Sequence, residues 1–411
     1  MSERIDTVVV GGGQAGLVVS HELARAGVDH VVLERGRIGE TWRGRWNSFC
    51  LVTPNWTVQL PCHPYDGEDP NGFMLRDEIV AYLERYSAAV EAPVREGVDV
   101  TALQPVTDGG FHLETSAGPL AAKIVILATG GYQRPHRPAG AATLPADLLQ
   151  IDVEDYHSPG DLPAGPVLLV GSGQSGCQIA EELHRAGRDV FLACGKAPWA
   201  PRRLGDHDIV WWAVETGFIN QPVGALPSPA ARLGANILTT GQGGGRDLHL
   251  RTLQRMGVTL LGHFLGAEDR RARFAPDLME SVAWGDARYG DLMNLVRKTV
   301  AERGLPQPDI PEPEPFTAET VEEVNLDGFG AVLFAGGFRP SFDTWVHCPG
   351  VVDEFGFPIQ EDGASTVVHG LYFAGVHFMR TRKSATFVGI GEDAAIVAGS
   401  VAATRERSAG V

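Results

Sequence analysis

Short apolar runs that end at glycine recur along the chain, and they predict the buried strands of a parallel sheet. The first run, residues 8–10, leads into the glycine-rich turn 11–16 and then into an apolar pattern that predicts a helix over 14–26. Gly27 ends this helix, and residues 29–34 predict a second strand. The order of strand, glycine turn, helix and strand predicts an α/β unit of the doubly wound type.

The same pattern returns in the middle of the chain. The apolar run 167–170 leads into the glycine-rich turn 171–176, a helical pattern that stops at Gly187, and a strand over 190–193. Two complete units predict an α/β protein with two dinucleotide-binding, Rossmann-like domains.

Two further apolar runs indicate how the two domains are connected. Residues 124–127 and 331–334 each lead into a glycine pair, an aromatic residue and an Arg-Pro dipeptide. We interpret them as crossings by which the chain leaves and re-enters the first domain, so that the second domain is an insertion in the first. The expected boundaries are 1–140 and 325–411 for the first domain and 160–320 for the second, with an aromatic-rich insertion on the substrate side.

The glycines of both turns fit G-x-G-x-x-G, a spacing with a physical reason at each position. The first glycine permits a tight turn, the second lets backbone N–H groups approach a diphosphate, and the third lets helix and strand pack closely. The helix N-terminus adds a partial positive charge. The expected cofactor-binding residues are Gly11, Gly13, Gln14, Ala15 and Gly16 in the first turn, and Gly171, Gly173, Gln174, Ser175 and Gly176 in the second.

The residue that closes the second strand of each unit separates the two sites chemically. Glu34 ends the strand of the first unit, where an acid holds a ribose hydroxyl pair. The matching residue of the second unit is Cys194, and cations follow it at Lys196, Arg202 and Arg203. Because cations bind a 2′-phosphate and a carboxylate repels it, the first site suits a nucleotide with a free ribose and the second suits NADPH. The alternative for the two arginines is a solvated loop.

Composition narrows the range of functions. The chain has 411 residues, of which 44% are apolar and 21% charged, and its formal net charge of −17 disfavours nucleic acid or an anionic membrane as the main partner. The five cysteines form no C-x-x-C pair and no zinc spacing, so we expect no metal site, reduced thiols and a cytoplasmic location. The first residues lack the apolar region of a signal peptide, and no apolar run approaches membrane-spanning length.

Together these motifs resemble the class B flavin-dependent monooxygenases, of the flavin-containing monooxygenase type, over nearly the whole chain. Besides the two fingerprints, the resemblance rests on the loop from Gly39 to Trp42, on Ala128-Thr129-Gly130 and on the segment 335–340. It implies FAD at the first fingerprint and NADPH at the second. It also implies that dioxygen forms a C4a-(hydro)peroxyflavin, which transfers one oxygen atom to a small organic substrate by N- or S-oxygenation or by Baeyer–Villiger insertion.

The resemblance also suggests individual site residues. Asn55 is similar to the asparagine that the family places beside the peroxyflavin, and we expect it to be catalytic. The C-terminal loop carries Arg380, Arg382 and Lys383 ahead of a predicted helix, an arrangement that suits negative charge on a reduced flavin ring. The other expected cofactor-binding residues are Arg35, Thr41, Trp42, Thr129, Gly130, Gly375, His377 and Ser384.

One departure from the family pattern leaves an alternative open. In the family motif F-x-G-x-x-x-H-x-x-x-[FY], Tyr156 fits the final aromatic residue, but Asp152 stands where the histidine belongs. A weaker hold on NADP⁺ would favour an NADPH oxidase or a quinone-type flavin reductase. The lack of C-x-x-C disfavours a disulfide reductase, and two intact sites argue against a non-catalytic flavoprotein. The sequence leaves the substrate and the oligomeric state open, and a homodimer is compatible with it.

Overall fold

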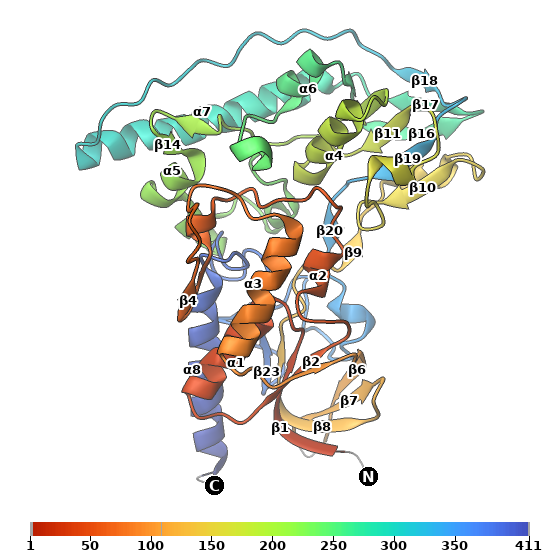
Figure 1. Cartoon of the computed structure of the whole chain (residues 1–411). Coiled ribbons are helices and arrows are strands. Elements are labelled where there is room, and N and C mark those ends of the chain that lie inside the picture. Colours follow the sequence, from red (N-terminus) through yellow and green to blue (C-terminus); the bar gives the residue numbers. More distant parts are fainter. Residues whose placement is uncertain (1–2, 108, 410–411) are drawn as a thin grey trace.

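The chain forms two domains that are stacked end to end and joined by a narrow waist (Figure 1). The computed structural model describes residues 3–107 and 109–409. Both chain ends lie at the base of the first domain, the lower one in Figure 1, and the second domain sits above it. The second domain is therefore an insertion in the first, as the sequence predicted.

A nine-stranded sheet forms the centre of the first domain. Its order is β21-β22-β23-β8-β1-β2-β5, with β7 pairing to β8 and β6 to β7. The pairings between β23, β8, β1, β2 and β5 are parallel. The strands are β1 (Glu3–Val10), β2 (Val31–Glu34), β5 (Val94–Glu96), β6 (Val100–Pro105), β7 (Phe111–Thr115), β8 (Leu120–Leu127), β21 (Gln360–Glu361), β22 (Ala364–Ser365) and β23 (Leu371–Phe373).

The second domain repeats this arrangement in a five-stranded parallel sheet of order β10-β19-β11-β12-β15. The central strand β11 lies between β19 and β12, just as β1 lies between β8 and β2. The predicted fold class, with two Rossmann-like domains, is therefore confirmed. The strands are β10 (Leu149–Asp152), β11 (Val167–Val170), β12 (Val190–Ala193), β15 (Thr259–Leu261) and β19 (Ala331–Phe334).

The expected domain boundaries need correction on both sides. Strand β19, which we assigned to the first domain, pairs with β11 through Leu169 and Leu333, and β10 extends the same sheet from a region expected to be a connection. The reason is that the apolar run of β19 fills the position beside β11 that β8 fills beside β1. The chain crosses the waist instead at β9 (Arg134–Pro135) and β20 (Phe338–Arg339), which pair antiparallel (Figure 1).

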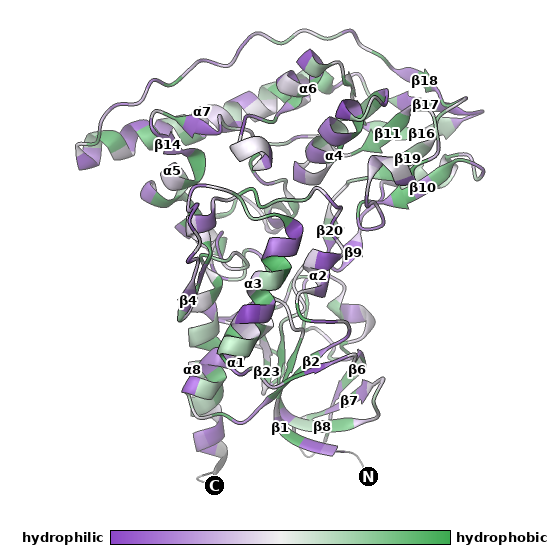
Figure 2. Ribbon diagram, viewed as in Figure 1, coloured by the Kyte–Doolittle hydropathy of each residue, from purple (hydrophilic) through white to green (hydrophobic). Residues whose placement is uncertain are grey.

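Helices cover one face of the first sheet, and successive side chains along each strand point alternately to this face and to the opposite one. Val9 and Ile126 pack in a core with α1 (Gln14–Arg25), α3 (Arg76–Ala89) and α8 (Ile390–Ala409). Val8 and Val10 point to the opposite face, where β6, β7 and the segment 342–357 complete a second core. Figure 2 shows this apolar interior between the more polar outer surfaces.

The second sheet is covered in a similar way. Helices α4 (Gln174–Arg185), α6 (Leu250–Met256) and α7 (Leu278–Arg303) pack on one face, and a small antiparallel sheet packs on the other. An extended segment runs from α7 across the top of the domain to β18 (Figure 1).

The remaining elements are α2 (Glu40–Arg43), α5 (Ile209–Glu215), β3 (Gln59–Leu60), β4 (His63–Pro64), β13 (Arg203–Leu204), β14 (His207–Asp208), β16 (Phe264–Glu268), β17 (Arg271–Phe274) and β18 (Glu323–Asn325). Over the described ranges, no helix has the length and apolar character needed to cross a membrane.

Candidate cofactor sites

The first glycine turn forms an open cradle at the start of α1. Gly11 has φ +109°, and a β-carbon there would lie 2.7 Å from the carbonyl oxygen of Ala128. A β-carbon on Gly16 would lie 1.8 Å from the Gly11 carbonyl oxygen, so only glycine allows this close packing of helix and strand. Beside Gly13, by contrast, no atom lies within 4 Å of such a β-carbon. The backbone therefore leaves open space at the helix N-terminus, which fits a diphosphate.

The second turn has the same geometry at the start of α4. Gly171 has φ +115°, and its β-carbon would lie 2.5 Å from the Ala335 carbonyl oxygen. A β-carbon on Gly176 would lie 1.9 Å from the Gly171 carbonyl oxygen. The side of Gly173 is again open, with the Ala235 methyl at 3.9 Å as its nearest neighbour. The two glycine turns therefore share one geometry, and each is a candidate cradle for a diphosphate.

Glu34 is the acidic residue beside the first cradle. Its carboxylate is buried at the end of β2 and accepts the backbone N–H groups of Gly12 at 2.5 Å and of Gly36 at 2.9 Å. These bonds fix the acid at the rim of the turn, where a ribose would lie. Arg35, the next residue, is exposed.

No carboxylate occupies the matching place in the second domain. Cys194 is buried there, its thiol donates to the Leu192 carbonyl oxygen, and burial raises its pKa to about 12, so the site carries no negative charge from this side chain. The hydroxyl of Ser172 instead accepts the N–H of Gly195 at 3.0 Å. Lys196 follows and is exposed.

His263 is a residue that the sequence reasoning missed at this second site. It follows β15, the strand beside β12, and its Nε2 atom lies 3.1 Å from where a β-carbon of Gly195 would be. Its Nδ1 atom is 2.6 Å from a carboxylate oxygen of Asp277. The signal that would have found it is its position directly after a strand that neighbours β12, because ends of parallel strands converge at one edge of the sheet.

The expectation for Arg202 is corrected by its surroundings. Its side chain is only 2% exposed and pairs with Asp208, whose Oδ2 atom lies 2.6 Å from Nη2. It also donates to the Val52 carbonyl oxygen of the first domain at 2.7 Å and lies over the Phe73 ring. Since its charge is already paired in a buried contact between the domains, Arg202 is a structural residue rather than a phosphate ligand. Arg203, on β13, is exposed.

The loop that follows β2 contacts the first glycine turn through Trp42. The indole N–H of Trp42 donates to the amide oxygen of Gln14 at 3.0 Å, and its ring stacks on Phe387 at 5.7 Å. The amide nitrogen of Gln14 donates in turn to the Ala385 carbonyl oxygen. The start of α1, the α2 turn with its exposed Thr41, and the C-terminal loop are thus brought together at one place.

The segment that follows β8, residues 128–133, borders the first glycine turn. Thr129 accepts the side-chain N–H of Gln133 at 2.9 Å, and the carbonyl oxygen of Gly130 accepts the same group at 2.7 Å. In the second domain the amide of Gln174 donates to the Thr239 carbonyl oxygen, while Ser175 is half-buried in the first turn of α4. These bonds hold the loops around each cradle.

The C-terminal loop approaches the first cradle at its start. A β-carbon on Gly375 would lie 2.3 Å from that of Ala15, so the end of β23 packs directly against α1. His377 is half-buried, stacks on Tyr132 and bonds the Arg232 carbonyl oxygen at 2.8 Å through Nε2, and desolvation lowers its pKa. The hydroxyl of Ser384 accepts the N–H groups of Arg380 and Thr381 and so shapes the loop.

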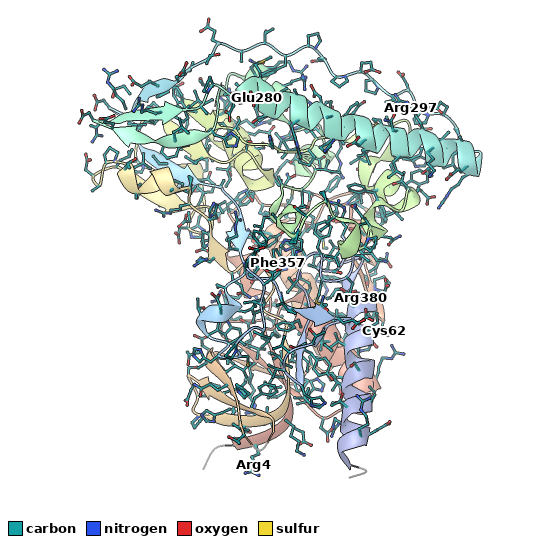
Figure 3. The ribbon with its side chains drawn as sticks, turned by 180° about the vertical axis from the view of Figure 1, so that it is seen from behind. Arg4, Cys62, Glu280, Arg297, Phe357 and Arg380 are labelled. Carbon is teal, nitrogen blue, oxygen red and sulfur yellow. The ribbon has the colours of Figure 1, made fainter. Side chains whose placement is uncertain are left out.

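Two of the three cations in this loop are already neutralised. Arg380, at the upper end of α8 in Figure 3, pairs with Asp393 at 2.9 Å and with Asp362, while Lys383 pairs with Glu392 at 2.8 Å. Arg382 has no acidic partner among the described residues and lies over the rings of Phe218 and Phe378. The charges of Arg380 and Lys383 are therefore balanced by acids, and a role for them beside a flavin ring stays a prediction.

Asn55 is buried, and both ends of its amide are engaged by its own loop. Nδ2 donates to the Asp69 carbonyl oxygen at 2.9 Å, and Oδ1 accepts the N–H of Met74 at 2.7 Å. These bonds give Asn55 a role in fixing the loop. A catalytic role for it stays a prediction.

Asp152, which stands in place of the family histidine, is held by an arginine. Its carboxylate accepts Nε and Nη2 of Arg137, both at 2.9 Å, at the end of β10. This position is close to the waist and has a negative charge where the family pattern has a neutral or cationic ring.

Comparison with known proteins places the chain in a family. It is 30% identical to an uncharacterized CzcO-like oxidoreductase of Geobacillus kaustophilus over 96% of this chain and 97% of that protein, and 28% identical to the CzcO oxidoreductase of Bacillus subtilis over 95% and 96%. The rice indole-3-pyruvate monooxygenase YUCCA1 is 32% identical, but over only 44% of this chain and 45% of its own. Residues 8–209 match the family model of pyridine nucleotide-disulphide oxidoreductases.

Solved structures share the fold over the whole chain. A flavin-containing monooxygenase from Stenotrophomonas maltophilia matches with a TM-score of 0.68 at 19% identity, over 98% of this chain and 99% of that one. OTEMO in complex with FAD and NADP matches with a TM-score of 0.59 at 14% identity, over 99% and 87%. The chain belongs to the CzcO-like oxidoreductases and is an enzyme with the fold of flavin monooxygenases, so the resemblance drawn from the sequence is confirmed.

Proposed function

We propose that the protein is an FAD- and NADPH-dependent monooxygenase that inserts one oxygen atom from dioxygen into a small organic substrate. The observation that carries this proposal is the pair of matched glycine cradles, of which one is bordered by the buried acid Glu34 and the other by Cys194 and Lys196. Their difference in charge separates a nucleotide with a free ribose from one with a 2′-phosphate.

The residues around the first cradle suit FAD. The open backbone beside Gly13 would bind the diphosphate, and Glu34 would hold the ribose hydroxyl groups. The hydrogen bond between Gln14 and Trp42 closes the loop over this position. The loop ahead of α8 would then face the flavin ring with the N-terminus of that helix.

The residues around the second cradle suit NADPH. The backbone beside Gly173 would bind its diphosphate, and the exposed Lys196 would bind the 2′-phosphate. The imidazole of His263 lies close to Gly195 and is a further polar group at this site. OTEMO, which shares the fold, binds both FAD and NADP, and this supports the assignment of two cofactors.

FAD held at the first cradle beside Gly13 and Glu34 would supply a hydride acceptor for NADPH and, in its reduced form, reactivity toward dioxygen. The protein binds and orients the two cofactors and keeps water from the reacting atoms. The contacts of Asn55 hold the loop 55–74 and so help to fix the wall of this site. A cytoplasmic location and a homodimer stay predictions from the sequence.

Isotope transfer tests the proposal. The purified protein is loaded with FAD and supplied with NADPH, ¹⁸O-labelled dioxygen and a panel of amines, thioethers and ketones. A monooxygenase places one ¹⁸O atom in the product. NADPH consumption that yields only hydrogen peroxide, with no labelled product from any class, would contradict the proposal.

The contact between Asp152 and Arg137 favours a second candidate, an NADPH oxidase or quinone-type flavin reductase. The expected consequence of the missing histidine is NADPH consumption uncoupled from substrate oxygenation. The variant Asp152→His is expected to lower hydrogen peroxide formation per NADPH at least several-fold, whereas Asp152→Ala should not. Loss of the exposed contact to Arg137 should cost no more than about 1 kcal/mol of stability.

A further inference from the structure

The loop that follows α2 crosses from the first domain to the second. Trp46 is buried in the core of the second domain, although it belongs to the chain segment of the first. The N–H of Asn47 donates to the His157 carbonyl oxygen of the second domain at 2.9 Å. Figure 1 shows α2 at the waist, next to the ribbon of β9 and β20. Arg45, between these anchors, therefore stands where the two domains meet.

A series of side-chain contacts connects Arg45 with the residues around the second glycine turn. Its guanidinium carbon lies 5.8 Å from the centroid of the Phe338 ring, and that ring is 5.7 Å from the ring of Tyr132. The side chain of Asn236 is a polar neighbour of the Tyr132 hydroxyl. Asn236 directly follows Ala235, whose methyl is the nearest atom to the open side of Gly173. Arg45 of the first domain thus belongs to the same wall as the diphosphate cradle of the second.

The charge of Arg45 is not paired within the protein. Its guanidinium takes part in no hydrogen bond or ion pair in the part of the chain that the structure describes. Burial lowers its pKa, against the opposing influence of Tyr132 and Glu154. Two other enclosed arginines differ, because Arg202 pairs with Asp208 and Arg251 pairs with Asp286. A half-buried guanidinium with five free donors requires an anion from outside to offset its desolvation.

We propose that Arg45 binds the diphosphate of the dinucleotide at the second cradle, so that a cation of the flavin domain completes the nucleotide site of the inserted domain. This inference rests on the proposed function, since it takes NADPH as the occupant. A planar guanidinium matches phosphate oxygens in geometry as well as in charge. The consequence is that NADPH binding depends on contact between the two domains, and so on the position of the loop that also closes over the first cradle.

The test measures binding to the FAD-loaded protein by isothermal titration calorimetry with two probes, NADP⁺ and 2′-AMP. NADP⁺ has the diphosphate, whereas 2′-AMP has only the 2′-phosphate and the adenosine. The variant Arg45→Met keeps an unbranched apolar side chain but removes the charge that lies over Phe338. It should raise the Kd of NADP⁺ at least 10-fold and leave the Kd of 2′-AMP unchanged. Arg45→Lys should fall between wild type and Arg45→Met.

Arg43→Met is the matched control, because Arg43 lies on α2 and its charge is already paired with Glu84. It should bind both probes like wild type. An unchanged Kd of NADP⁺ in Arg45→Met would overturn the inference. The inference would also be overturned if this variant kept the Kd of NADP⁺ and lost affinity only for an acidic substrate. A wild-type protein that binds neither probe would overturn the proposed function itself, and a thermal unfolding curve confirms that each variant is folded.

Discussion

The carboxylate of Glu34 accepts the backbone N–H of Gly12 at 2.5 Å, which places an acid against the glycine turn of the first domain. In the second domain the contact between turn and strand end runs in the opposite direction, because the hydroxyl of Ser172 in the turn accepts the N–H of Gly195 at 3.0 Å. Two turns of one geometry are therefore bordered by different charges. This difference is the physical basis for assigning a different nucleotide to each domain.

Reversal of the charge at Glu34 should remove the flavin. In Glu34→Arg a cation replaces a buried acid, so the backbone N–H groups of Gly12 and Gly36 lose their acceptor and the ribose loses its partner. A cost of about 3 kcal/mol corresponds to more than a 100-fold loss of affinity. Glu34→Gln keeps one acceptor oxygen and should lose about 10-fold. The ratio of flavin to protein absorbance measures the effect, and full flavin occupancy in Glu34→Arg would contradict the assignment.

Removal of the charge at Lys196 should reduce the preference for NADPH. A charge-assisted contact to a 2′-phosphate is worth about 1.4 kcal/mol or more, so Lys196→Met should raise the KM for NADPH about 10-fold. The KM for NADH should change less than about 2-fold, because NADH lacks that phosphate. Steady-state kinetics with both nucleotides measures this. An equal rise for NADH would show that Lys196 acts on the fold or on another part of the nucleotide.

Arg202 and Arg203 are adjacent in sequence but should respond differently to substitution. Arg202→Met leaves Asp208 buried without its partner, which costs about 3–5 kcal/mol. Arg203→Met removes an exposed cation and should change stability by less than about 0.5 kcal/mol. Urea unfolding of the two variants measures both values. Equal stability of the two variants would contradict the structural role assigned to Arg202.

The stability of the protein should fall in acid partly because of His249. This side chain is 6% exposed and packs against Trp199 with tilted rings. Burial lowers its pKa to about 4, and the nearby charges of Arg251 and Arg255 add to this shift, while Asp286 opposes it. The pKa of a histidine in an unfolded chain is about 6.5. Between this value and the lower pKa of the folded state, the unfolded state binds a proton at this residue and the folded state does not. The stability present above pH ~6.5 is then lost as the pH falls toward ~4, by about 3 kcal/mol at most.

The variant His249→Asn tests this expectation. Asparagine is a good residue for the position that precedes α6, and it does not titrate. The difference in unfolding free energy between pH 7 and pH 4.5 should be smaller in the variant by about 2 kcal/mol. An unchanged difference would mean that His249 does not contribute to the acid sensitivity.

The repeated α/β pattern was predictable because it is local. The helix expected over 14–26 is observed as α1, and the paired fingerprints define the two domains. The positions of β10 and β19 were not predictable in the same way. Their place in the second sheet depends on pairing with β11, a contact between distant segments that no local pattern encodes.

Those parts of the site that depend on backbone geometry were predictable from the sequence. Those that depend on ion pairs between side chains were less predictable. The open space beside Gly13 and Gly173 follows from the spacing of the glycines. The charge of Arg202, in contrast, is neutralised by Asp208 across the short pairing of β13 with β14. A basic residue near a nucleotide site in the sequence therefore does not show whether its charge is free.

The most direct test of the two-site account is anaerobic reduction of the purified, yellow protein by NADPH and by NADH, followed at the flavin absorbance. The account predicts one FAD per chain and reduction at least about 10-fold more efficient with NADPH, since a single charge-assisted contact to phosphate provides this factor. A colourless protein that takes up no added flavin, or equal efficiency with both nucleotides, would contradict it.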